Sequence, residues 1–161
     1  MRHSMLHDRQ QMPCSASVDS VFDVVCGLGG DSGWPGGNVL WQIRGLIDRV
    51  IGGVGMRRGR VDSCQLHVGE PLDFWRVEVL DPPHLLRLRA EMKLPGTAWL
   101  EFNIQPRSDG VWIEQTAYFQ PSGLMGLLYW YILKPFHRFI FPGLARAICR
   151  RAELAIAPTI S

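Results

Sequence analysis

The sequence lacks the features that mark several common functional classes. Its formal net charge is only +2 over 161 residues, whereas nucleic-acid binding requires a clustered basic face. No Cys-x-x-Cys pair occurs, and the four cysteines are widely separated. Neither a nucleic-acid partner nor a bound metal is therefore expected. The four cysteines are Cys14, Cys26, Cys64 and Cys149. Their wide separation is typical of free thiols in a reducing, cytoplasmic compartment.

Long apolar runs are missing as well. The best candidate begins at Gly123, but its uncharged stretch ends at Leu133 after eleven residues, whereas a membrane-spanning helix needs about 20. Residues 1–15 contain several charges and few apolar side chains, unlike a signal peptide. We predict one cytoplasmic domain over residues 1–161, large enough to fold without disulfides or metal. Its two ends, residues 1–14 and 154–161, are expected to be poorly ordered or at an edge of the fold.

Three segments show the spacing of apolar residues that is typical of helices. The first covers residues 18–26, with Ser17 or Asp19 as its cap. The second covers residues 38–50 and ends at a glycine pair. The third covers about residues 123–153, and we expect Pro135 to kink or divide it because proline removes one helical hydrogen bond. Its predicted apolar side consists of Leu124, Leu127, Leu128, Tyr131, Phe136, Phe139 and Ile140.

Between residues 72 and 120 the apolar residues recur at every second position. This pattern predicts four antiparallel strands with one apolar and one charged face. Short turn sequences separate the strands at residues 81–83, 95–96 and 108–110. A sheet with a single apolar face must be covered, and the C-terminal helix is the obvious cover. The sequence therefore predicts an α+β fold.

Turn lengths predict how these strands pair. A four-residue first turn places Val79 opposite Leu86, and a three-residue second turn places Arg89 opposite Glu101. Both choices align the apolar faces and pair opposite charges on the outer face. A one-residue slip would destroy both features.

Several motifs, in one order, make a more specific resemblance. They are Gly29-Gly30-Asp31-Ser32-Gly33-Trp34, Asp73-Phe74-Trp75-Arg76-Val77, Ala90-Glu91-Met92-Lys93-Leu94-Pro95-Gly96, Gln115-Thr116-Ala117-Tyr118-Phe119 and Leu128-Tyr129-Trp130-Tyr131. Over about residues 15–153 the chain resembles an uncharacterised bacterial family of START-like (SRPBCC, polyketide-cyclase-like) domains, often found behind an NAD(P)-binding, epimerase-like domain. The resemblance implies the helix-grip fold, a curved antiparallel sheet wrapped around a long C-terminal helix with a ligand-sized cavity between them. It transfers no catalytic residue.

The implied cavity gives the leading hypothesis, a binding domain for an apolar or amphipathic small molecule such as a lipid, isoprenoid or polyketide-like compound. Ligand pockets are mostly apolar, with few polar groups. Gln115 interrupts the apolar face of its strand, so it is either a structural hydrogen-bonding group or the polar anchor of the ligand. No cofactor is expected. The predicted ligand contacts are Trp34, Trp41, Trp75, Met92, Leu100, Phe102, Gln115, Phe119, Leu128 and Tyr131.

Two histidines support a second hypothesis, an enzyme of the cyclase, hydratase or isomerase kind. His67 precedes the strands and His137 follows Pro135 in the C-terminal helix. Either can act as a general base if it faces the cavity. No carboxylate partner is evident from the sequence, and a histidine without one is more often structural.

A third hypothesis is a docking module for an NAD(P)-binding epimerase-like protein or for a membrane surface, acting through the helix around Lys134 to Arg138. Two glycine-rich segments suggest other ligands less strongly. The stretch at residues 27–30 lacks the third glycine of a dinucleotide fingerprint, since Ser32 stands there. Residues 52–60 combine glycines with arginines that can hold a phosphate or carboxylate, although a solvated turn explains them as well.

Overall fold

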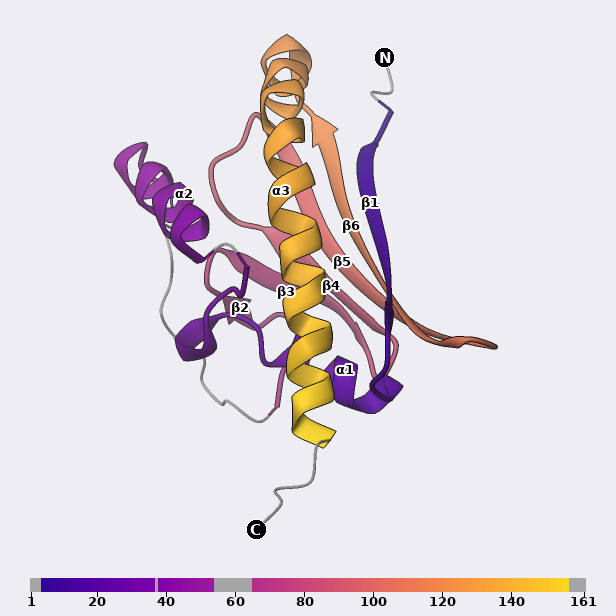
Figure 1. Cartoon of the computed structure of the whole chain (residues 1–161). Helices are drawn as coiled ribbons and strands as arrows, with labels where there is room; N and C mark the ends of the chain where they lie inside the picture. Colours follow the sequence, from indigo (N-terminus) through magenta and orange to yellow (C-terminus); the bar gives the residue numbers. More distant parts are fainter. Residues whose placement is uncertain (1–3, 37, 54–64, 157–161) are drawn as a thin grey trace.

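A six-stranded antiparallel sheet forms the frame of the molecule, in the strand order β1-β6-β5-β4-β3-β2. Its strands are β1 (Leu6–Cys14), β2 (Pro71–Leu72), β3 (Trp75–Asp81), β4 (Leu85–Ala90), β5 (Gly96–Arg107) and β6 (Gly110–Pro121). Figure 1 shows the computed structural model, which describes residues 4–36, 38–53 and 65–156. Within these ranges the helices are α1 (Val18–Cys26), a short 3-10 turn η1 (Gly30–Ser32), α2 (Asn38–Val50) and α3 (Gly123–Ile156). The α+β helix-grip fold is thereby confirmed.

The predicted helices form at the expected residues. Ser17 caps α1, since its hydroxyl accepts a hydrogen bond from the Ser20 N–H at 3.2 Å. Helix α3 continues through both Pro135 and Pro142, so the chain is not divided at Pro135. Each proline removes only one helical hydrogen bond. The packing of α3 side chains against the sheet stabilises the helix despite that loss. None of the described helices is both long and apolar enough to cross a membrane.

Strand pairing follows the predicted faces except at the end of β3, and it differs from several predicted pairs. Val77 lies opposite Leu88, and a bulge then shifts the register so that Val79 lies opposite Arg87 on the outer face, while Leu80 takes the inner position opposite Leu86. The predicted inward position of Val79 is therefore wrong. On the next strand pair, Arg89 lies opposite Trp99, not Glu101. That second error is a shift of two residues, because the connection between β4 and β5 is longer than a three-residue turn. A shift of two leaves every side chain on its predicted face.

The outer face of the sheet carries the charges as expected. Arg87 donates a hydrogen bond to Glu101 at 2.7 Å, and Arg76 forms an ion pair with Glu91. The N-terminal segment adds β1 as an edge strand paired with β6 from Leu6 to Cys14. Alternation along β1 turns two unexpected polar side chains, Asp8 and Gln10, toward the inner face between Leu6 and Met12.

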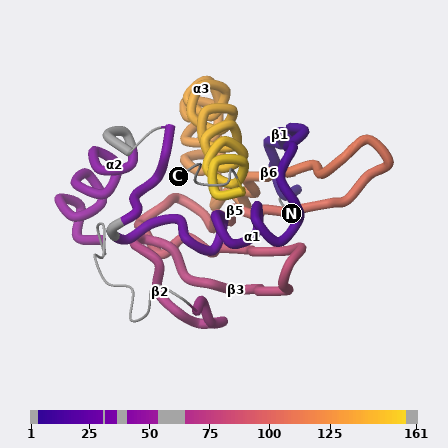
Figure 2. The backbone as a smooth tube through the Cα atoms, turned by 60° about the horizontal axis from the view of Figure 1, so that its bottom comes forward, coloured from indigo at the N-terminus to yellow at the C-terminus, as the bar shows by residue number. Residues whose placement is uncertain are grey.

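Helix α3 lies across the inner face of the sheet, and its two halves pack differently. Figures 1 and 2 show the sheet curving beneath the helix, with α2 to one side and α1 near its C-terminal half. From Phe141 to Ala152 the helix buries a continuous stripe against the sheet and α1. Its first half buries only Gly126 and Trp130. The second half therefore closes the core, while the first half stands off and leaves space.

The predicted apolar side of α3 is wrong for most of its members. Leu124, Leu128, Tyr131, Phe136 and Phe139 are all more than half exposed. The buried stripe is rotated around the helix, and its large side chains are Trp130, Phe141, Leu144 and Ile148. The physical reason is that α3 is oriented by the packing of its second half, which also fixes the direction of every side chain in its first half.

Candidate functional site

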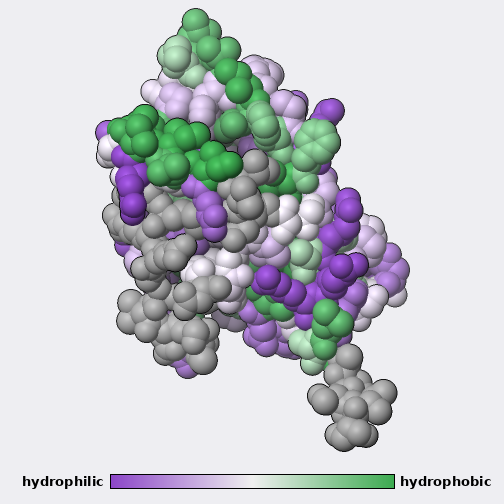
Figure 3. All heavy atoms as spheres, turned by 60° about the vertical axis from the view of Figure 1, so that its left-hand side comes forward, coloured by the Kyte–Doolittle hydropathy of each residue, from purple (hydrophilic) through white to green (hydrophobic). Residues whose placement is uncertain are grey.

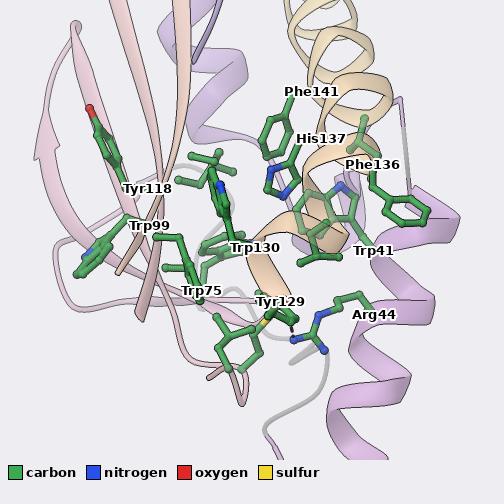
Figure 4. A pocket seen from close by; sticks show the side chains of 18 of the residues that line it. Trp41, Arg44, Trp75, Trp99, Tyr118, Tyr129, Trp130, Phe136, His137 and Phe141 are labelled. Atoms are coloured by element: carbon green, nitrogen blue, oxygen red, sulfur yellow. Dashed lines mark hydrogen bonds between the residues drawn. The ribbon is translucent and has the colours of Figure 1, made fainter. Parts of the chain in front are cut away.

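A cavity of about 360 Å³ lies between α2, the inner face of the sheet and the first half of α3. Aromatic and aliphatic side chains form most of its wall, and Figure 4 shows Trp75 and Trp130 among the rings that surround it. The cavity opens between α2 and α3, where Ile47 and Phe136 line it and are about half exposed. We call this opening the mouth. Its position makes the cavity accessible to a ligand from outside.

Small residues on the sheet create the space. Ala98 on β5 and Ala117 on β6 face α3 and line the cavity, as does Leu100 between them. Trp99 and Tyr118 also border it, but they are paired with each other on the outer face. Figure 4 shows their rings pointing away across the sheet. A larger side chain at either alanine would fill the space between sheet and helix.

A cluster of four aromatic rings builds the wall beside α2. Trp41 of α2 stacks on Phe74 with ring centroids 5.5 Å apart and meets the edge of Trp75 at 6.2 Å. Trp34 lies behind this layer, and its indole N–H donates a 2.7 Å hydrogen bond to the buried Asp73. The loop before α2 is thus fixed to the sheet, which holds the Trp41 ring in the cavity wall.

Arg44 and Tyr129 form a polar link across the wall near the mouth. The Arg44 guanidinium donates to the Tyr129 hydroxyl at 3.3 Å (Figure 4). It also donates to the Lys93 carbonyl at 3.4 Å. Burial raises the pKa of the Tyr129 hydroxyl, and the nearby Arg44 charge opposes that rise. The buried Asp48 carboxylate accepts a 2.6 Å hydrogen bond from the Lys93 N–H. These contacts hold α2 against the β4–β5 connection and α3.

His137 provides the second polar group at the cavity, and it has a carboxylate neighbour. Its ring stacks on Phe141 at 4.6 Å and meets Trp130 edge-on at 5.5 Å. The buried Nδ1 atom lies 4.0 Å from Asp8 Oδ2, within range of an ion pair but too far for a hydrogen bond. Burial lowers the pKa of His137, and the Asp8 carboxylate partly offsets this by raising it. An imidazole next to a carboxylate is an arrangement that can bind or move a proton.

The structure brings five of the ten predicted ligand contacts and one of the two histidines to the cavity wall. They are Trp41, Trp75, Met92, Leu100, Phe119 and His137. Whether these residues touch a ligand stays a prediction.

The other predicted contacts lie elsewhere. Trp34 and Phe102 are fully buried in the solid part of the core, where Phe102 pairs with Gln115 across β5 and β6. Leu128 and Tyr131 point outward because of the rotation of α3. None of the five residues Trp34, Phe102, Gln115, Leu128 and Tyr131 lines the cavity, so they are not its walls, lid or anchor.

Gln115 and His67 need separate corrections. Gln115 is fully buried, and neither of its side-chain polar atoms has a hydrogen-bond partner among the described residues. It does not line the cavity, so it is not the predicted cavity anchor, and its predicted structural hydrogen bond is not found among the described residues. The side chain of His67 is 71% exposed, 3.8 Å from Glu70, and away from the cavity. His137 is the remaining histidine candidate.

Sequence reasoning missed Asp8 and Arg44, and it named Tyr129 only as part of a motif. Asp8 lies 129 positions before His137 on a strand whose pairing with β6 no local pattern announces. Arg44 could have been noted as a charge on the inner side of an amphipathic helix.

Among the described residues, no cluster of His, Cys, Asp or Glu could hold a metal ion. Most of the arginine-rich segment at residues 52–60 lies outside the described residues.

Comparison with known proteins agrees with this architecture. A family model described as "Protein of unknown function (DUF2867)" matches residues 1–144. A search of curated protein sequences found no match. The predicted association with an epimerase-like domain stays a prediction.

Several solved structures are similar in fold. The Zhui aromatase/cyclase from Streptomyces sp. R1128 is 15% identical with a TM-score of 0.57, over 98% of this chain and 99% of its own. Norcoclaurine synthase from Thalictrum flavum is 13% identical with a TM-score of 0.56, over 97% of this chain and 90% of its own. A protein from Nitrosomonas europaea is 12% identical with a TM-score of 0.55, over 93% and 96%. At such low identity these structures show the fold alone.

Proposed function

This chain belongs to the family described as a protein of unknown function (DUF2867), and from its own site we propose that it binds an apolar or amphipathic small molecule in the cavity. The observation that carries the proposal is an apolar cavity of about 360 Å³ with an open mouth. Ligand pockets range from about 300 to 1,000 Å³, so this one suits a small molecule. Similar folds in an aromatase/cyclase and in norcoclaurine synthase support a role with small molecules.

The wall chemistry narrows the class of ligand. Flat indole rings at Trp41 and Trp75 favour a ligand with a flat or unsaturated apolar body, as in isoprenoid or polyketide-like compounds. Arg44 and Tyr129 can hydrogen-bond to a carboxylate, hydroxyl or carbonyl at one end of it. The proposed ligand is therefore an amphipathic molecule whose polar end lies near the Arg44–Tyr129 pair.

Ligand binding can be tested by titration with a fluorescent apolar probe, together with mass spectrometry of material extracted from the purified protein. Ala98→Phe fills the cavity from the sheet side, and Ala98→Leu fills less of it in case the larger ring disturbs folding. The matched control is Ala155→Phe, at an exposed position near the end of α3. We expect Ala98→Phe to weaken binding at least tenfold and Ala155→Phe to leave it unchanged. Absence of saturable binding by the unmodified protein would refute the proposal.

A second candidate function is favoured by one observation, the Asp8 carboxylate 4.0 Å from His137. A buried imidazole with a lowered pKa is neutral at pH 7 and can accept a proton. The reaction that fits is tautomerisation of an apolar ketone. His137 removes a proton from the carbon beside the carbonyl, the electron pair forms the enol double bond, and the proton returns to oxygen. No co-reactant is required.

Hydrogen–deuterium exchange of β-tetralone in D₂O, followed by NMR, tests this second candidate. The expected result is exchange faster than in buffer, reduced to the buffer rate by His137→Phe and reduced in part by Asp8→Asn. His67→Phe serves as the control, because His67 is exposed and far from the cavity. Equal exchange in protein and buffer would exclude acid–base catalysis on such ketones and leave ligand binding as the function.

A further inference from the structure

Exposed apolar side chains gather around the cavity mouth. Twelve of the sixteen large apolar residues exposed on the described part of the chain lie on α2, at its end, or on the first half of α3. Figure 3 shows hydrophobic residues over α2 and along the upper part of α3. We call these residues the mouth surface, and they are Ile43, Leu46, Ile47, Val50, Ile51, Leu124, Met125, Leu128, Tyr131, Ile132, Phe136 and Phe139. Large exposed apolar patches on a protein usually mark an interaction site.

The first half of α3 is apolar on both of its long sides. At 100° per residue, its exposed apolar side chains share one side of the helix, whereas those that line the cavity or core share the opposite side, and Phe136 lies at the boundary and belongs to both sets. Leu124 and Phe139 are 81% and 82% exposed, so little of their apolar surface is covered by this chain. A helix that is apolar all around is normally buried on all sides. The described residues of this chain leave its outward side uncovered.

Helix α2 repeats the pattern on the other side of the mouth. Its inner side carries Trp41, Arg44 and the buried Asp48, which hold it against the rest of the fold. Its outer side carries the apolar residues, of which Val50 is 78% exposed. Ile43 and Ile47 belong both to this outer side and to the lining of the cavity. The mouth surface and the cavity are thus continuous.

Positive charge flanks the mouth surface. Lys134 and Arg138 are exposed and one turn apart on α3, beside the exposed apolar stripe, and Arg49 is exposed on α2. Within α2 and residues 123–141 the one acidic residue is Asp48, which is buried. Apolar side chains flanked by cations are typical of helices that lie in the interface of an anionic membrane. The charge of this surface is complementary to anionic lipid headgroups.

We propose that the mouth surface docks onto an anionic lipid bilayer, so that the cavity opens toward the hydrocarbon region of the membrane. The apolar side chains of α2 and α3 enter the outer part of the bilayer, and Lys134, Arg138 and Arg49 contact the headgroups. An apolar ligand then passes between membrane and cavity without crossing water. Docking depends on the outer sides of the two helices and is independent of whether the cavity holds a ligand.

Co-sedimentation with vesicles tests the docking. Vesicles of phosphatidylcholine alone are compared with vesicles that also contain phosphatidylglycerol. We expect binding to the anionic vesicles, with a loss of about fivefold in affinity for each of Lys134→Ala and Arg138→Ala, since one surface cation is worth about 1 kcal/mol. Phe139→Asp and Leu124→Asp abolish binding. The matched control is Leu154→Asp, an equally apolar, 67% exposed position at the other end of α3, which leaves binding unchanged.

The remaining outcomes overturn the proposal. A protein that stays in solution with both kinds of vesicle refutes it. If light scattering then shows a dimer that Phe139→Asp dissociates, the mouth surface is covered by a second copy of the chain. Equal loss with Leu154→Asp would show a nonspecific effect of the added charge.

The cavity-filling variant Ala98→Phe separates this proposal from ligand binding, because it is expected to bind anionic vesicles normally.

Discussion

His137 is expected to make the folded protein less stable as the pH falls below neutrality. Its side chain is only 17% exposed, between the rings of Trp130 and Phe141. Burial lowers the pKa of this imidazole, and the Asp8 carboxylate opposes the shift without cancelling it. In the unfolded chain the pKa of a histidine is about 6.5. Between that value and the lower pKa of the folded state, the unfolded chain therefore holds more protons.

The sign and size of the effect follow from this difference. The free energy of unfolding is unaffected by His137 above about pH 6.5 and decreases as the pH falls from there, because protons bind preferentially to the unfolded state. Because His137 binds a single proton, it can change the free energy of unfolding by at most about 1.4 kcal/mol per pH unit. The loss stops below the pKa of the folded state, where both states are protonated. Asp8→Asn removes the group that raises the pKa, so the loss should continue to lower pH.

Urea unfolding between about pH 5 and pH 8 measures this dependence. The quantity to compare is the free energy of unfolding of the unmodified protein minus that of His137→Phe at each pH. This difference removes the contributions of all other titrating groups. We expect it to fall with decreasing pH from about pH 6.5. Parallel curves for the two proteins, or a higher His137 pKa in Asp8→Asn by NMR titration, would refute the reasoning.

Three substitutions test the packing around the site by urea unfolding. Trp34→Phe removes the hydrogen bond to the buried Asp73 carboxylate and should cost about 1.5–3 kcal/mol, and a loss below about 0.5 kcal/mol would contradict this role. Gly126→Ala places a methyl group against the Pro95 carbonyl and should cost about 1–3 kcal/mol, whereas an unchanged midpoint would show that α3 can shift there. Gln115→Met replaces a buried amide that has no hydrogen-bond partner within residues 4–36, 38–53 and 65–156, and it should stabilise the fold by about 1 kcal/mol. Destabilisation would indicate that the amide is satisfied.

Local signals in the sequence predicted most of the fold. Ser17 is the cap of α1 because its hydroxyl accepts from a backbone N–H three residues later, which is a contact within one turn. Alternation predicted the inner and outer faces of β4 to β6 and of β3 as far as Val77, because side-chain direction in a regular strand alternates with its own backbone. The specific pairs were less predictable. One extra residue in the bulge between Val77 and Val79 shifts every pair beyond it.

The site depended on contacts that no local pattern contains. Asp8 and His137 meet only because β1 joins the edge of the sheet beside β6, under α3. Gln115 was expected at the cavity because it shares a face with Phe119, and both do face inward. The two are four residues apart along β6, however, and the solid part of the core begins between them. The tilt and rotation of the covering helix α3 determine which end of the inner face of the sheet borders the cavity.

Helix α3 shows why its rotation was predicted wrongly and why this matters for function. In its second half, exposed arginines such as Arg146 and Arg150 alternate with a buried stripe, so only one orientation buries the apolar residues. In its first half, apolar residues lie on every side, and their spacing cannot distinguish inward from outward. A helix that only covered the sheet could carry charge at Leu124 and Phe139, which are more than four-fifths exposed, with little loss of burial. Their apolar character gives no benefit to this fold in water, and is explained if the mouth surface enters a membrane.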